Sequence, residues 1–194
     1  SDTFDELYTQ YESDESIPRR TIGAQELILD LLKERAETGR IYIMNIDHCN
    51  THSSFKDKVS MSNLCQEITL PTTPIQHIDD GQGEIALCIL SAINVGKINK
   101  IEEIDELCEL AVRGLDALID YQDYPVKAAE ESTKNRRSLG VGYIGLAHYL
   151  AKNGVKYDDP EAWKLVHALT ERFQYALLDA SNHLSMEKGP CGYF

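Results

Sequence analysis

Three groups capable of chemistry alternate along one short stretch of the chain: the amide of Asn63, the thiol of Cys65 and the carboxylate of Glu67. In an extended backbone, residues two apart point to the same side, so the sequence predicts that the three share one face of an extended segment over 63–70. A carboxylate beside a thiol disfavours a second negative charge. That pairing favours a neutral S–H that can lose a hydrogen atom over a thiolate nucleophile.

Each of these residues also has an ordinary structural interpretation. In that interpretation, Cys65 is a small buried hydrophobe, Glu67 is a solvated strand residue, and Asn63 is a turn residue. A further thiol, Cys88, lies inside the apolar run 84–95. The residues alone favour packing for Cys88, because a continuous apolar run is typical of a strand buried on both faces.

The elements before this site are predicted from periodicity. Residues 1–20 are acidic and polar and form a weakly specified leading segment. Apolar residues at helical spacing then predict a helix that ends at Gly39, and alternation predicts a short strand over 41–45. Residues 46–61 are polar and irregular in pattern, and a polar loop is expected around Asp80.

The elements after the site are predicted from capping signals as well. Asn99 resembles the first residue of a capping box that opens a long helix, with Cys108 on its buried stripe. Another helix is expected over 141–152. The run 140–145 fits a dinucleotide-binding fingerprint only formally, because a polar stretch precedes it, and close helix packing explains its glycines better.

The last predicted element is a long helix with Asp159 as its N-cap and Pro160 in its first turn, running to about Lys188. Strands that alternate with helices indicate an α/β fold.

Composition excludes several classes of function. The net charge of −13 disfavours binding to a nucleic-acid polymer, and no apolar run approaches the ~18 residues of a membrane span. Five cysteines at irregular spacing argue against a secreted disulfide framework and favour the cytoplasm. His48, Cys49 and His52 lack a second pair at zinc spacing, so a hydrogen-bonding network is expected there in place of a metal site. Neither end of the chain resembles a natural domain end, so we expect an excerpt of a longer protein.

Together these stretches resemble a known family. The segment with Asn63, Cys65 and Glu67 and the run 84–95 are similar to the large, catalytic subunit of class I aerobic ribonucleotide reductase. Further similar stretches, in the order and at the spacing of that family, are 39–52, 118–125 and 136–142. The resemblance implies part of a ten-stranded α/β barrel with a finger loop that carries the reactive cysteine. It divides the chain into the leading segment 1–20 and a partial catalytic barrel domain over 21–194.

The resemblance also implies roles for the four residues. Cys65 becomes the thiyl radical that abstracts the ribose 3′-hydrogen, Glu67 is the base for the 3′-hydroxyl, and Asn63 holds the sugar. Cys88 is one of two thiols that reduce the 2′-carbon and become a disulfide, and its partner lies outside this chain. The implied reaction converts ribonucleoside diphosphates to 2′-deoxyribonucleoside diphosphates for DNA synthesis.

The implied partners are the rest of the large subunit, a homodimer in the family, a small radical-generating subunit that contains a metal, and thioredoxin or glutaredoxin. No cofactor or metal is expected in this chain, and the ATP and deoxynucleotide effectors bind elsewhere in the full subunit. Alone, the excerpt is expected to be inactive.

Two other interpretations remain open. In the first, the chain is a separately made assembly module of a split large subunit and is inactive until complemented. In the second, it is a stand-alone thiol redox protein that uses Cys65 and Cys88. Against the last, neither cysteine has a CxxC partner or an obvious electropositive neighbour.

Overall fold

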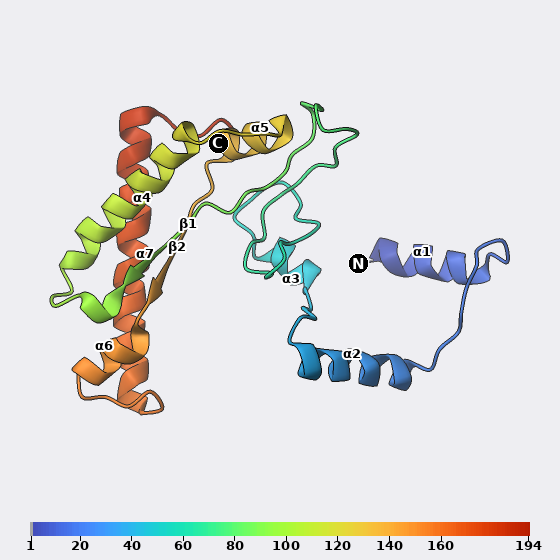
Figure 1. The fold of residues 1–194 in the computed structure, drawn as a ribbon, viewed down its shortest axis with the longest axis horizontal. Coiled ribbons are helices and arrows are strands. Elements are labelled where there is room, and N and C mark those ends of the chain that lie inside the picture. The colour runs from blue at the N-terminus through green and yellow to red at the C-terminus, as the bar shows by residue number, and fades with distance from the viewer. Residues whose placement is uncertain (1) are drawn as a thin grey trace. The chain divides into compact units, whose positions relative to one another are not determined.

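The computed structural model describes residues 2–194, which form two compact units that divide between Pro71 and Thr72. The first unit contains three helices, α1 (Asp2–Ser13), α2 (Ala24–Thr38) and α3 (Ile46–Thr51) (Figure 1). The second contains strands β1 (Leu90–Asn94) and β2 (Gly140–Ile144) and, as helices, η1 (Val95–Lys97), α4 (Glu103–Tyr121), α5 (Lys127–Arg136), α6 (Leu146–Lys152) and α7 (Pro160–Lys188).

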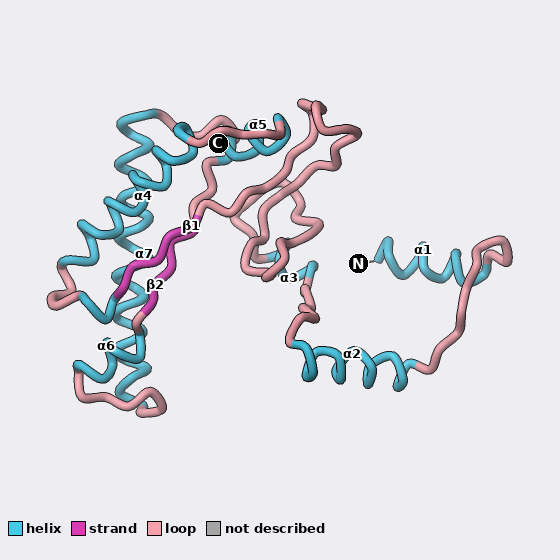
Figure 2. The backbone as a smooth tube through the Cα atoms, viewed as in Figure 1, coloured by secondary structure: helices cyan, strands magenta, loops and turns pink. Residues whose placement is uncertain are grey.

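Helix α2 confirms the helix predicted before Gly39, whose left-handed backbone (φ 66°) closes it. No residue of α2 is buried, and its apolar side chains Leu27, Ile28 and Leu32 are at least half exposed. The predicted strand over 41–45 is wrong, because that stretch is irregular and leads directly into α3. Helix α1 lies in the leading segment, and α3 in the stretch that was expected to be irregular. Figure 2 shows the chain between α3 and β1 as loop, which includes the loop expected around Asp80.

In the second unit, β1 and β2 pair in parallel, with Leu90 opposite Gly140 and Asn94 opposite Ile144. Parallel strands require a long crossover, and here α4 and α5 provide it. The prediction that the whole run 84–95 is a strand buried on both faces is wrong. Only Leu90–Asn94 within it is a strand, and exposed and half-buried residues alternate along this strand.

Helices α4 and α7 lie side by side and form the core of this unit (Figure 1). Buried residues three or four apart along α4 face a matching stripe on α7, as the 3.6-residue period requires. The main cluster is Val95, Ile98, Ile104, Cys108, Leu169, Phe173 and Ala176. The predicted burial of Cys108 is confirmed, since its exposed fraction is 0%. The ring of Tyr143 from β2 packs edge-on against Phe173, with centroids 5.5 Å apart.

The ends of α4 and α7 are closed by different means. Asp159 caps α7 as predicted, because its Oδ1 accepts a hydrogen bond from the Glu161 N–H at 2.9 Å. The capping box predicted at Asn99 is wrong: Glu102 is the N-cap of α4 and makes no side-chain capping bond, while the Glu103 carboxylate accepts the Lys100 N–H at 3.0 Å. The oxygen of the Asn99 side chain instead accepts from Lys152 at 3.3 Å.

The glycine-rich run 140–145 differs from its prediction. Its first five residues form β2 in place of a helix, and the expected helix begins only at α6. Gly145 joins the two with φ +80°, and a Cβ there would lie 2.4 Å from the Asn94 side-chain oxygen. Both the backbone angle and the close approach therefore require glycine at this turn.

Candidate active site

The residues 63–67 form a turn, so the predicted extended segment is wrong. The Gln66 N–H donates to the Asn63 carbonyl at 3.1 Å, and Gln66 adopts a left-handed backbone with φ 62°. A non-glycine residue with positive φ is uncommon and occurs mostly in turns. The alternation of side chains that holds for a strand therefore does not apply between Asn63 and Glu67.

The side chain of Asn63 braces this turn from within. Its Oδ1 accepts the N–H of Ile68 at 3.0 Å and lies 3.3 Å from the Ser62 hydroxyl, which itself donates to the Ile68 carbonyl at 2.5 Å. These contacts fix the two ends of the turn to each other. The alternative interpretation of Asn63 as a turn residue thus describes its place in this structure.

At the tip of the turn, Cys65 and Glu67 are exposed, and Leu64 between Asn63 and Cys65 is 90% exposed. A short braced turn thus carries a thiol and a carboxylate that are both exposed. Residues 63–67 therefore form a loop that carries the Cys65 thiol and the Glu67 carboxylate.

Cys88 lies in the second unit, on irregular backbone two residues before β1, and its side chain is exposed. Packing in a buried strand, which the residues alone favoured, is wrong for Cys88. Its neighbour Ile89 is the buried residue and packs with Leu115 and Ile119 of α4. Asn63, Cys65 and Glu67 are therefore held together in one turn, whereas Cys88 belongs to a separate unit.

A shallow cavity of about 480 Å³ lies in the first unit, next to the turn. Its lining includes Gln66 of the turn, His48 of α3, and His52, which is the C-cap of α3. The Nδ1 of His52 lies 2.9 Å from the Thr51 hydroxyl and 3.1 Å from the His48 carbonyl, which is the hydrogen-bonding network that the sequence predicted. Within residues 2–194 no three His, Cys, Asp or Glu side chains gather where they could hold a metal ion.

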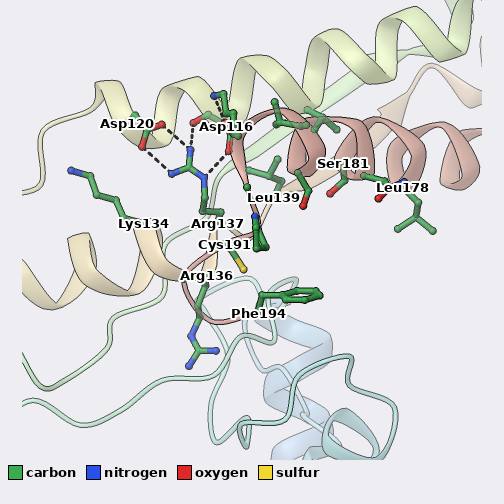
Figure 3. Close-up of a pocket in the computed structure, with 18 residues that line it drawn as sticks. Asp116, Asp120, Lys134, Arg136, Arg137, Leu139, Leu178, Ser181, Cys191 and Phe194 are labelled. Carbon is green, nitrogen blue, oxygen red and sulfur yellow. Dashed lines mark hydrogen bonds and ion pairs between the residues drawn. The ribbon is translucent and has the colours of Figure 1, made fainter.

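The second unit carries a larger cavity of about 630 Å³, which the sequence did not indicate (Figure 3). Asp116 of α4 is 5% exposed there and accepts 2.7 Å hydrogen bonds from Arg137 and from Lys188. Burial acts to raise the pKa of Asp116, but the hydrogen bonds and charges of Arg137 and Lys188 outweigh it and hold the pKa below its usual value. Arg137 reaches Asp120 as well, at 2.9 Å. Because these cations are paired with carboxylates, the cavity is poorly suited to binding an anion. The ion pairs among Asp116, Asp120, Arg137 and Lys188, here called the clasp, instead join α4, α5 and α7.

Burial governs the remaining thiol of the core. It raises the pKa of Cys108 to about 11, with a smaller contribution from the charge of Asp105. The Sγ of Cys108 lies 4.0 Å from the Phe173 carbonyl. Cys108 is therefore an inert packing residue, in contrast to the exposed Cys65.

Comparison with known proteins places the chain in a family. The chain is 60% identical over 196 residues to the ribonucleoside-diphosphate reductase subunit alpha of Haemophilus influenzae, covering 100% of this chain and 26% of that protein. It is 53% identical to ribonucleoside-diphosphate reductase 1 subunit alpha of Escherichia coli, covering 98% of this chain and 26% of the relative. The phage T4 subunit alpha is 44% identical, again over 100% of this chain and 26% of the relative.

The chain thus spans about a quarter of the length of these curated relatives. None of the helices in residues 2–194 combines the length and the apolar character needed to cross a bilayer. The family model described as "Ribonucleotide reductase, barrel domain" matches residues 1–194, the whole of the sequence. The chain belongs to the ribonucleotide reductase barrel-domain family.

Proposed function

We propose that this chain is a central part of the catalytic subunit of a ribonucleoside-diphosphate reductase, which replaces the ribose 2′-hydroxyl with hydrogen. The observation that carries the proposal is the braced turn at Asn63, on and next to which Cys65 and Glu67 are both exposed, in a chain of this family. The function belongs to the complete subunit, and the isolated chain is expected to be inactive.

In the proposed reaction, a thiyl radical on Cys65 takes the 3′-hydrogen of the substrate, which restores the S–H and leaves a radical on C3′. Glu67 accepts the proton of the 3′-hydroxyl, a role that requires only hydrogen-bond reach to the same sugar. One of the two reducing thiols, Cys88 or its partner outside this chain, gives a proton to the 2′-hydroxyl, which leaves as water. The two sulfurs then form a disulfide and supply the two electrons and the second hydrogen, which C2′ receives in place of the hydroxyl. Glu67 returns its proton to the 3′-oxygen, and Cys65 returns its hydrogen to C3′ and becomes the thiyl radical again. The balance is one ribose hydroxyl and two thiols to one deoxyribose, one disulfide and one water.

Asn63 has two capacities in this scheme. Its side-chain oxygen already accepts the Ile68 N–H and so holds the turn, while an amide also carries two N–H donors suited to a sugar hydroxyl. We propose that the residue orients the sugar and braces the turn at once.

The open sheet supports the proposal that the chain is one part of a ten-stranded barrel with a finger loop around Cys65. The described residues form a sheet of two parallel strands, and parallel sheets are normally covered on both faces and flanked by further strands. Leu90 of β1 is 47% exposed and Ile144 of β2 is 54% exposed. Strands from the remainder of the subunit would pair with these edges. The partial barrel domain over 21–194, after the leading segment 1–20, is part of this proposal.

The same proposal includes the partners expected from the family: a ribonucleoside diphosphate as substrate, a small metal-containing subunit that supplies the radical, thioredoxin or glutaredoxin to reset the disulfide, and nucleotide effectors bound elsewhere in a cytoplasmic homodimer. The comparisons give no support to the alternative of a split-subunit assembly module.

The test is reduction of CDP to dCDP by a complete large subunit that carries this segment, mixed with its small subunit. Cys88→Ser should abolish turnover with thioredoxin, because a dithiol reduction requires both sulfurs. Cys108→Ser is the matched control, since Cys108 is buried and unreactive and its replacement should leave turnover intact. Full turnover with Cys88→Ser would refute the proposal.

A further inference from the structure

Two adjacent arginines at the end of α5 extend in opposite directions (Figure 3). Arg137, the C-cap with a left-handed backbone (φ 47°), reaches Asp116 and Asp120 on α4. Arg136 instead reaches Glu84, which lies 52 residues earlier in the chain. The left-handed turn at Arg137 is what separates the directions of the two side chains.

The contact between Arg136 and Glu84 is a buried ion pair. One guanidinium nitrogen lies 2.8 and 3.1 Å from the two carboxylate oxygens of Glu84, and the side chains are only 7% and 10% exposed. The ring of Tyr193 covers the guanidinium, with its centroid 4.8 Å away. Burial and the charge of Glu84 raise the pKa of the Tyr193 phenol, while Tyr193 as a whole remains 51% exposed. Removing one partner of such a pair leaves a buried charge uncompensated.

Glu84 begins the segment that carries Cys88. Glu84 exchanges two backbone hydrogen bonds with Thr73, at 2.9 and 3.2 Å, and the Ile85 N–H donates to the Ala128 carbonyl at 3.2 Å. At the other end of the segment, the Ile89 carbonyl accepts the Gly140 N–H at 2.9 Å. Cys88 therefore lies on a short irregular bridge anchored at both ends.

An arginine lies next to each anchor. Arg136 holds the Glu84 end directly. The pairing of β1 with β2 holds the other end, and Arg137, three residues before Gly140, ties the chain that enters β2 to Asp116 of α4. The side chain of Cys88 is exposed.

We propose that Arg136 and Arg137 are positioning residues that clamp the two ends of the Cys88 segment and so aim this thiol at its redox partner and at the substrate. Disulfide formation tolerates only a narrow range of geometries, with Cβ atoms about 3.5–4.5 Å apart. A thiol on an unclamped loop would meet that condition only part of the time. The inference rests on the proposed function, since it presupposes that Cys88 is a reductant.

The test uses the complete large subunit with its small subunit and compares Arg136→Gln with Arg113→Gln. Arg113 is the matched control, because it also joins two elements through a carboxylate, at 2.6 Å to Glu187, but lies on the α4–α7 surface. We expect Arg136→Gln to lower kcat for CDP by about 10- to 100-fold with KM unchanged, the cost typical of a small misplacement of a reacting group. Alkylation of Cys88 by iodoacetamide, measured by mass spectrometry against Cys65 as the internal reference, should accelerate.

Equal kcat and equal Cys88 alkylation in the Arg136→Gln and Arg113→Gln variants would overturn the proposal. If Arg136→Gln fails to fold, Arg136→Lys decides alone. Faster alkylation of Cys88 than in wild type supports the clamp, and an unchanged rate overturns it. A Cys88→Ser subunit in the same assay separates the two levels: turnover that survives Cys88→Ser refutes the proposed function itself, whatever the Arg136 variants do.

Discussion

The clasp at Asp116 yields a quantitative prediction for Arg137→Ala. Arg137 donates four hydrogen bonds to α4: one to the Asp116 side chain, one to the Asp116 carbonyl and two to Asp120, at 2.7–2.9 Å. The Asp116 side chain is 7% exposed, whereas that of Asp120 is 55% exposed. The two carboxylates therefore contribute unequally to stability.

Breaking a buried pair by removing one partner costs about 3–5 kcal/mol, and the exposed Asp120 pair contributes less than about 1 kcal/mol. Lys188 remains 2.7 Å from Asp116 and retains part of the compensation, so we expect a total loss near the lower limit, about 3 kcal/mol. Because Arg137 has φ 47°, Arg137→Gly should be less destabilising than Arg137→Ala by about 1 kcal/mol, since glycine adopts this backbone without a Cβ clash.

Amide hydrogen exchange in the complete subunit measures this local loss. A change of about 3 kcal/mol corresponds to a decrease in protection of roughly 100-fold, expected in α4 near Asp116 and in the last turns of α7. Arg113→Ala is the control, because its pair with Glu187 is exposed and should change protection by less than about fivefold. A decrease for Arg137→Ala no larger than that of the control would refute the reasoning.

Three further predictions concern single groups. At pH 8, Cys108 should resist iodoacetamide while the exposed Cys65 reacts, because at a pKa of about 11 only about one Cys108 in 1,000 is ionised, and mass spectrometry of the two peptides checks this. Asp159→Ala should destabilise the N-terminus of α7 by about 1 kcal/mol, seen as faster amide exchange in its first turn; an unchanged rate would contradict the cap. The Asp116 pKa is lowered by folding, so its contribution to stability is full above about pH 5 and is lost as the pH falls through the folded pKa; a pH series of exchange rates on wild type and Asp116→Asn tests this sign.

Local signals in the sequence predicted the elements that depend on local interactions. Helix α7 was predicted because Asp159 and Pro160 act on their own neighbours at its start, and in the structure it ends at Lys188 before Gly189, whose φ is 88°. The burial of Cys108 followed from helical periodicity alone. The candidate site residues were predicted from the resemblance to the family, since their types and order are visible in the sequence.

The remaining features depend on contacts between distant residues. Strand β2 forms in a glycine-rich run with weak strand preference because it pairs with β1, whose residues lie 50 positions earlier in the sequence. Polar and apolar residues alternate in the turn at Cys65 as they do in a strand, and the residue type of Gln66 does not predict its left-handed backbone. The ion pair between Glu84 and Arg136 spans 52 residues, so neither residue alone predicts it.

The measurement that tests the central claim most directly is CDP reduction by complete subunits carrying Cys65→Ser or Glu67→Gln, with Cys49→Ser as the matched control. Cys49 lies in α3 of the same unit and has no role in the proposed reaction. The account predicts no dCDP from Cys65→Ser, because a serine hydroxyl cannot replace the thiol as hydrogen-atom carrier. It predicts a rate at least about 100-fold lower for Glu67→Gln, and the wild-type rate for Cys49→Ser. Formation of dCDP at the wild-type rate by Cys65→Ser would contradict it.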